Sequence, residues 1–274
     1  MKGASRNALK RVLESFEGSV GVLPEAASSR EVSEGLYAVA ALLDREPSLR
    51  RALTDPASTA GSRQDLVSGL VGAQLTELPL GVLRGLVAEH WDSSADLRTA
   101  VEAVAANAAM RSAEAEGVLD EVEDELFRFA RLLDREPSLR AALTDPGLPV
   151  DRKTALLREL LGARAQEITQ RLIEIAVIRP HVGSLETALE DLSTLAAQRR
   201  QRYIAQVRVA QPLDAAQYDR LGASLARIYG RQVQLQIDVD PSVVGGIEVR
   251  VGDEIIDATV SRRLQDVRRT FAGQ

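Results

Sequence analysis

The sequence predicts a mainly α-helical protein, in which two tandem small helical bundles, one a duplicate of the other, precede a small α/β domain with a β-hairpin. Three observations lead to this prediction. A 15-residue segment occurs twice, 45% of the residues are hydrophobic while only 3% are aromatic, and the hydrophobic period changes after Arg202. Cores of Ala, Leu, Val and Ile are typical of packed helices, and strict alternation is typical of half-buried strands.

The repeated segment reveals the duplication. Residues 42–56 read LLDREPSLRRALTDP and residues 132–146 read LLDREPSLRAALTDP, so 14 of 15 positions are identical at an offset of 90 residues. Weaker identity continues to residues 97–104, which match residues 185–192 at an offset of 88. A unit of about 90 residues is longer than the 20–50 residues of stacked repeats. It therefore indicates a duplicated small domain. Duplication of a scaffold favours a role in binding or in extending the length of the protein.

We expect three domains from this pattern. The first copy occupies residues 1–110, the second copy occupies residues 111–201, and a C-terminal domain occupies residues 202–274. A chain of 274 residues is long enough to give each domain its own core.

Helix boundaries follow from apolar spacing and from helix-breaking residues. In each copy a helix meets a proline, Pro47 or Pro137, and the short helix after it ends at Thr-Asp-Pro. Ser184 stands where an N-cap is expected. The helix over 96–114 is expected to run almost continuously into the second copy. The predicted helices cover 35–43, 48–53, 65–75, 79–91, 96–114, 121–134, 152–161, 166–178 and 185–196.

The C-terminal domain is expected to combine strands and helices. Gly252-Asp253 is a two-residue turn between two alternating segments, which predicts a β-hairpin. The predicted strands cover 204–209, 233–239, 247–251 and 254–257, and the predicted helices cover 214–229 and the arginine-rich segment 259–271. One face of the hairpin is expected to carry Val249, Val251, Ile255 and Ile256.

Composition excludes several classes of function. The chain has no cysteine, so disulfides, thiolate metal sites and cysteine nucleophiles are excluded. Its two histidines, His90 and His181, are too far apart to suggest a metal site, and we expect no metal, no cofactor and no catalytic residue. The net charge of −6 argues against a basic nucleic-acid-binding protein. No segment approaches the roughly 20 apolar residues of a membrane span, and the N-terminus lacks a signal peptide, so we expect a soluble cytosolic protein.

Two kinds of charged cluster allow alternative interpretations. The repeated Asp-Arg-Glu at 44–46 and 134–136 could supply paired carboxylates, but with no nearby nucleophile a solvated helix end is favoured. The arginine clusters either form a solvated face or contact an acidic partner helix. These clusters are Arg199, Arg200 and Arg202, and Arg262, Arg263, Arg268 and Arg269.

The glycine pair Gly245-Gly246 also allows two interpretations. It permits backbone angles that other residues avoid at a bulge or close approach. Phosphate binding is disfavoured, since neither a helix N-terminus nor a P-loop lysine follows the pair.

The C-terminal domain resembles a known family. Residues 241–257 read PSVVGGIEVRVGDEIID and are followed by Val260 and Arg263-Leu264. This pattern resembles the C-terminal signature of the δ subunit of bacterial F-type ATP synthase, which is equivalent to the mitochondrial oligomycin-sensitivity-conferring protein. The second copy resembles the helical domain of that family, and the first copy is additional, as in forms with a duplicated helical domain.

The resemblance implies a non-catalytic subunit of the peripheral stalk, or stator. It implies that the helical domain binds the N-terminal helices of the α subunits in the catalytic head. It further implies that the C-terminal domain binds the C-terminal end of the stalk b subunit, with no nucleic acid bound and no direct insertion into the membrane. The implied location is the cytoplasmic face of the bacterial cell membrane, within the heteromeric ATP synthase. The alternative is a free helical adaptor or regulator that binds partner helices or nucleic acid.

Overall fold

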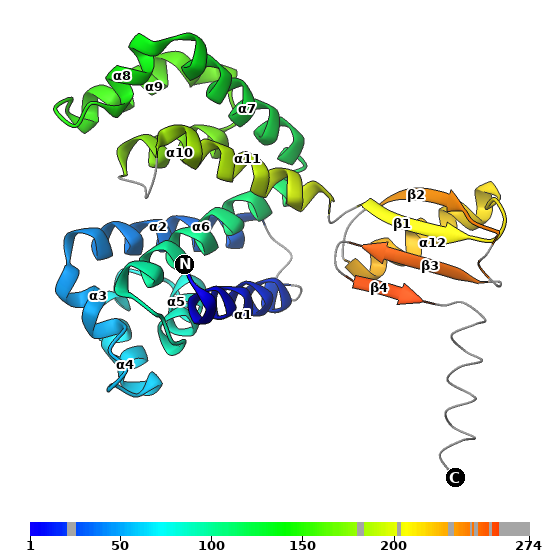
Figure 1. Cartoon of the computed structure of the whole chain (residues 1–274), viewed down its shortest axis with the longest axis horizontal. Helices are drawn as coiled ribbons and strands as arrows, with labels where there is room; N and C mark the ends of the chain where they lie inside the picture. The colour runs from blue at the N-terminus through cyan, green and yellow to red at the C-terminus, as the bar shows by residue number, and fades with distance from the viewer. Residues whose placement is uncertain are drawn as a thin grey trace. The chain divides into compact units, whose positions relative to one another are not determined.

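A computed structural model (Figure 1) describes residues 1–20, 26–179, 184–201, 204–229, 233–241, 243, 246–251 and 254–257. The chain divides into two compact units, Met1–Ala196 and Ala197–Gln274. Each unit is described separately.

The first unit is helical throughout its regular structure, as predicted. Its helices are α1 (Gly3–Val20), α2 (Ala26–Arg45), α3 (Pro47–Leu53), α4 (Ala60–Val71), α5 (Glu77–Ala88), α6 (Ser94–Ala115), α7 (Leu119–Arg135), α8 (Pro137–Thr144), α9 (Val150–Leu161), α10 (Glu167–Ile178) and α11 (Leu185–Gln201), which ends in the second unit. A 3-10 turn covers Gly162–Arg164.

Capping residues explain several of the helix starts. The side chain of Thr59 accepts a hydrogen bond from the backbone N–H of Ser62 at 3.1 Å, and Ser93 accepts one from Asp96 at the same distance. Ser184 accepts a hydrogen bond from the backbone N–H of Thr187 at 3.3 Å, which confirms the predicted N-cap.

The helices of the first copy recur in the second copy about 90 residues later. Helix α2 ends at Arg45 and α7 at Arg135, while α4 corresponds to α9 and α5 to α10 with no shift in bounds. Helix α1 is not among the predicted helices, although the charged residues between its apolar positions are compatible with an amphipathic helix. Its counterpart 90 residues later, 93–110, falls in α6. Helix α6 is therefore the last helix of the first copy and takes the place of a first helix in the second.

Helix α6 joins the two copies through its packing. It lies along α2 and also contacts α1, α3 and α5 of the first copy, and it contacts α7 and α10 of the second (Figure 1). Small and apolar residues occur all round it, from Leu97 to Ala113, and most of them are buried. A single continuous apolar core extends from α1 to α11.

The predicted boundary between residues 110 and 111 thus falls inside a helix, and the three-domain division remains a prediction. The expected near-continuity of α6 with the second copy is interrupted, because α6 ends at Ala115 and α7 begins at Leu119. Gly117 between them has a φ of 73°, which lies in the left-handed region that favours glycine.

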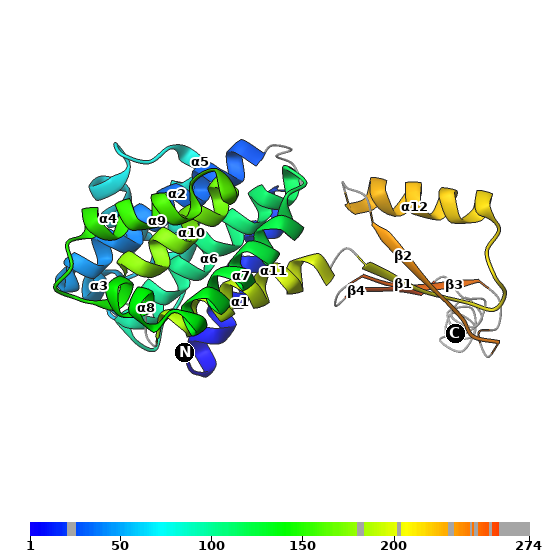
Figure 2. The ribbon, with the colours of Figure 1, turned by 90° about the horizontal axis from the view of Figure 1, so that it is seen from above.

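The C-terminal unit is a small α/β fold, as predicted. Its four-stranded sheet has the order β2-β1-β3-β4, with β1 parallel to β2 and antiparallel to β3, and with β3 and β4 forming an antiparallel pair. Its elements are β1 (Ile204–Val209), α12 (Ala215–Tyr229), β2 (Gln234–Val239), β3 (Ile247–Val251) and β4 (Glu254–Asp257). Figure 2 shows α12 on one face of the sheet. The predicted helix over 259–271 lies outside the described residues.

Alternation along the strands gives the sheet one apolar face. Val207 of β1 and Val249 and Val251 of β3 are buried in this core, while Arg208 and Arg250 are exposed. The register pairs Ile256 with Val249 and Ile255 with Arg250. The expectation that Ile255 and Ile256 share the face of Val249 and Val251 stays a prediction, because the side chains of β4 lie outside the described ones. Gly246 precedes β3 with a φ of 87°, which explains why glycine stands there.

Candidate partner-binding surfaces

The first copy has an open groove between α1, α2 and α5, with a volume of about 390 Å³. Buried apolar side chains of α1 and α2 form its floor, and α5 contributes half-buried or exposed positions. Its lining includes Val12, Phe16, Val32, Leu78, Gly81, Val82 and Gly85. An apolar floor of this kind can receive the apolar face of an amphipathic helix.

Two glycines keep the α5 side of this groove open. A Cβ atom placed on Gly81 or Gly85 would meet no other atom within 4 Å, so neither glycine is required by packing within the chain. Glycine at such positions lets another backbone approach closely.

An ion pair links α1 to Glu89, the C-cap residue of α5, at the edge of the groove. The guanidinium of Arg11 donates from Nε to Glu89 Oε1 at 3.2 Å and makes a second hydrogen bond to the other carboxylate oxygen. The hydrogen bonds and charge of Glu89 raise the pKa of Arg11.

The corresponding face of the second copy is covered by α2 of the first. Arg30 Nη1 lies 2.9 Å from Glu167 Oε2, and Arg171 Nη2 lies 3.3 Å from Glu34 Oε2. Arg179 also donates a hydrogen bond to the backbone carbonyl of Tyr37 in α2. A cavity of about 250 Å³ remains between α2, α6, α9 and α10.

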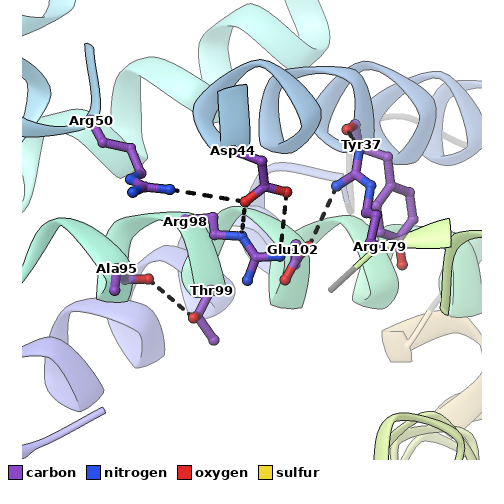
Figure 3. Close-up of polar contacts among 8 residues, drawn as sticks. All are labelled: Tyr37, Asp44, Arg50, Ala95, Arg98, Thr99, Glu102 and Arg179. Carbon is purple, nitrogen blue, oxygen red and sulfur yellow. Dashed lines mark hydrogen bonds and ion pairs between the residues drawn. The ribbon is translucent and has the colours of Figure 1, made fainter. Parts of the chain in front are cut away.

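A chain of charged side chains continues from this contact into the first copy (Figure 3). Glu102 on α6 lies 3.4 Å from Arg179 and 3.0 Å from Arg98, and Arg98 also binds the carboxylate of Asp44. Arg98, Glu102 and Arg179 are all largely buried, at 9%, 14% and 11% side-chain exposure. Buried charges need such partners, because an unpaired one is costly.

Tyr37 lies next to this network. Its side chain is buried, and the guanidinium carbon of Arg179 lies 5.6 Å from its ring centroid. Burial, together with the negative charge of Glu102, raises the pKa of Tyr37.

The repeated carboxylates differ in their surroundings. The Asp44 carboxylate is bound by Arg98 and lies 3.9 Å from Arg50, whereas Asp134 and Glu136 are exposed. Asp44 thus forms ion pairs at a helix end, as favoured from the sequence. One of its partners, the buried Arg98, is distant in the sequence and is not indicated by the local pattern.

The two histidines and the arginine clusters are the other candidates for a functional site, and the structure describes some of these residues. His90 is exposed, and across the described ranges no three His, Cys, Asp or Glu side chains cluster as a metal site. Arg199 is 2% exposed and Arg200 is exposed, so of these two arginines Arg200 is the one accessible to solvent or to a partner helix. His181, Arg202 and the arginines of 259–271 lie outside the described residues.

The sheet of the C-terminal unit offers a second, polar surface. Its face opposite the apolar core has a shallow hollow of about 500 Å³, lined by Gln206, Arg208, Gln236, Ile237, Asp238, Glu248 and Arg250. Arg208 lies 2.5 Å from Asp240 and 3.5 Å from Glu248, so its charge is paired. In the part of the chain that the structure describes, no helix is long and apolar enough to cross a membrane.

A helical unit with an open groove and a separate α/β unit with a polar face are the features of a subunit that joins partners. Residues 102–271 match the family model described as "ATP synthase delta (OSCP) subunit". The chain belongs to this family, whose members are structural, non-catalytic subunits of the ATP synthase.

Relatives named "ATP synthase subunit delta" match almost the whole chain. The protein from Parafrankia sp. (strain EAN1pec) is 47% identical over 98% of this chain and 99% of its own length. The one from Streptomyces griseus is 46% identical over 100% of both chains, and the one from Streptomyces avermitilis is 48% identical over 88% and 89%. The first copy is therefore shared with these relatives, although most of it precedes the family-model match.

A solved structure of the Toxoplasma gondii mitochondrial ATP synthase hexamer contains a chain that is 20% identical. The match covers 61% of this chain and 94% of that one, with a TM-score of 0.33.

Proposed function

We propose that this chain, a stator subunit of the F-type ATP synthase by its family, links the catalytic head to the stalk b subunit at the cytoplasmic face of the bacterial membrane. The helical unit binds the N-terminal helix of an α subunit. The C-terminal unit binds the C-terminal end of the b subunit.

The observation that carries this proposal is the division of the chain into two compact units with different candidate surfaces. The open groove of the helical unit has an apolar floor suited to an amphipathic helix. The sheet of the C-terminal unit instead presents paired charges. Two separate contacts suit a stator, because torque on the rotor would turn the head unless several contacts held it together.

Site-specific photo-crosslinking in membranes tests both contacts in the full chain. A photoreactive amino acid at Gly81 reports on the groove, and one at Gln206, which is exposed on β1, reports on the sheet face. We expect the first position to capture peptides from the N-terminus of the α subunits, and the second to capture peptides from the C-terminus of the b subunit. The same probe at exposed Glu31 of α2 is the control for random collisions.

Exchange of the two products would overturn the assignment of partners to units. Loss of the chain from washed membranes, together with crosslinks to nucleic acid, would instead support the free-regulator alternative.

A further inference from the structure

We propose that α2 of the first copy is a built-in occupant of the second copy's groove, so that of these two grooves the one in the first copy is open to a partner helix. The proposal rests on the proposed function only for the identity of that partner, the N-terminal helix of an α subunit. The contact between α2 and α10 is a property of this chain alone.

The two grooves correspond position by position. In the first copy the groove lies between α1 and α5, and 90 residues later the same positions lie on α6 and α10. An ion pair bridges the two helices in both cases. It joins Arg11 to Glu89 in the first copy and Glu102 to Arg179 in the second. Arg179 is the counterpart of Glu89, whereas Glu102 lies one position beyond Val101, the counterpart of Arg11.

Helix α2 lies across the second of these grooves. Its residues Arg30, Glu34 and Tyr37 are spaced by four and three, so they lie on one helical face. In the same order they contact three positions along α10 and its C-terminal end, Glu167, Arg171 and Arg179. Three contacts in matching order describe a helix lying along a groove rather than a single crossing point.

If α2 covers the second groove, the apolar side chains of α10 should be more buried than their counterparts in α5, and they are. Ile168, Leu172 and Ile175 of α10 are buried, with exposures of 8%, 1% and 7%. Their counterparts in α5, Leu78, Val82 and Gly85, are only half-buried. The apolar positions that remain accessible in the first copy are therefore covered in the second.

The sequence differences between the two grooves agree with an open groove in the first copy and a covered groove in the second. The positions of Gly81 and Gly85 in α5 are taken by Arg171 and Ile175 in α10. Glycine leaves room for a foreign backbone, whereas Arg171 pairs with Glu34 of this chain. An occupant on the same chain also has a high effective concentration, which disfavours displacement by an external helix.

A matched pair of substitutions tests which groove binds the partner. Gly81→Leu places a bulky side chain in the open groove, and Arg171→Leu makes the same residue at the equivalent position of the covered one. Because a Cβ at Gly81 meets nothing within 4 Å, the leucine is compatible with the fold, and circular dichroism checks this. The probe is a synthetic peptide of the α subunit's N-terminus from the same organism, titrated calorimetrically against the full chain.

We expect one peptide per chain and an affinity loss of about tenfold or more for Gly81→Leu, as for a disrupted contact centre. Arg171→Leu should leave the affinity within about twofold, as surface changes outside an interface do. The reverse order of effects, or two peptides per chain, would overturn the proposal.

A crosslink tests the built-in occupant without any peptide. The chain has no cysteine, so Glu34→Cys/Arg171→Cys introduces a unique pair. A short bismaleimide is used in place of a disulfide. A disulfide requires Cα atoms within about 7 Å of each other, and an ion pair between two long side chains does not imply so short a Cα distance. We expect an intramolecular crosslink, and none from the single-cysteine controls Glu34→Cys and Arg171→Cys.

The peptide separates this proposal from the proposed function. If saturating peptide abolishes the Glu34–Arg171 crosslink, the peptide displaces α2 and the proposal fails. If the crosslink forms but no peptide binds, α2 is the occupant as proposed and the assignment of the α subunit as partner fails instead. If no crosslink forms in the peptide-free chain, the built-in occupant is refuted directly.

Discussion

Arg179, at the C-terminal end of α10, donates a hydrogen bond to the backbone carbonyl of Tyr37 in the middle of α2. These two residues are 142 positions apart and belong to different copies of the repeat. Arg179 also pairs with Glu102 on α6, so a single guanidinium contacts both copies and the helix that joins them. The copies are held together by specific polar contacts as well as by the shared apolar core.

Arg179→Ala should destabilise the helical unit. The change leaves the largely buried Glu102 without one of its two cations and the Tyr37 carbonyl without its donor. We expect the free energy of unfolding to fall by about 2–3 kcal/mol, because a buried polar group left unpaired is costly. Urea denaturation followed by circular dichroism measures this change.

Arg11→Ala is the control, since Arg11 forms an exposed ion pair with Glu89, the counterpart of Arg179 in the first copy. Its side chain is 57% exposed, so solvent screens the pair. We expect a loss of less than about 1 kcal/mol. Equal losses for the two variants would show that burial of the network does not strengthen it.

The sequence predicts the repeated helices well, because their signals are local. Pro47 and Pro137 mark the same break in both copies, and Ser184 caps its helix as expected. Helix α1 is missing from the predicted helices although its signal is local too. Its buried positions, Ser5, Ala8, Val12 and Phe16, follow helical spacing with charged residues between them, which is typical of an amphipathic helix.

The covered groove could not be predicted, because it depends on contacts between distant segments. Arg30 and Glu167 are 137 residues apart, and no local pattern pairs them. The repeat itself suggests two equivalent grooves. Only the packing of α2 shows that they differ, and the replacement of Gly81 by Arg171 becomes informative once that packing is known.

Two truncations test whether α6 is shared between the copies. A chain that begins at residue 93 keeps α6, whereas a chain that begins at residue 111 loses most of it. Because α6 contacts α7 and α10, we expect the longer fragment to unfold cooperatively in urea. Both fragments lack α2 and should bind a hydrophobic dye. Only the shorter one should lose cooperativity, since it also lacks most of the α6 surface on which α7 and α10 pack.

Indistinguishable unfolding of the two fragments would support the three-domain division at residue 110. Loss of structure in both would show that the two copies form one inseparable core.

The cap of α11 should make stability depend on pH. The Ser184 hydroxyl, the backbone and Arg140 lower the pKa of Glu186 from its ordinary value of 4.5. A carboxylate with a lowered pKa stabilises the fold above its unfolded pKa, and that contribution is lost as pH falls through the folded value. Ser184→Ala should therefore cost about 1 kcal/mol at pH 7 and less at pH 3, measured by urea denaturation.

Thr59→Ala is the control for this effect. Thr59 caps α4 through the backbone N–H and the hydroxyl of Ser62, neither of which titrates in this pH range. Its cost should be about the same at both pH values. A pH-dependent cost at Thr59, or a constant cost at Ser184, would show that the Glu186 interaction does not contribute.

The last prediction concerns Gly246, which enters β3 with a φ of 87°. Gly246→Val places a β-branched side chain in a backbone region that such residues avoid, at a cost of about 1–3 kcal/mol. This cost is a large share of the stability of a small domain, so we expect the C-terminal unit to unfold while the helical unit stays folded. The variant should lose binding to the b subunit and retain binding to the peptide of the α subunit, measured in parallel titrations. Ser224→Val adds the same residue at an exposed position of α12, where serine and valine have similar helix propensities, and should leave the fold intact. If Gly246→Val instead lost binding to the α subunit and kept binding to the b subunit, the proposed division of labour between the two units would be reversed.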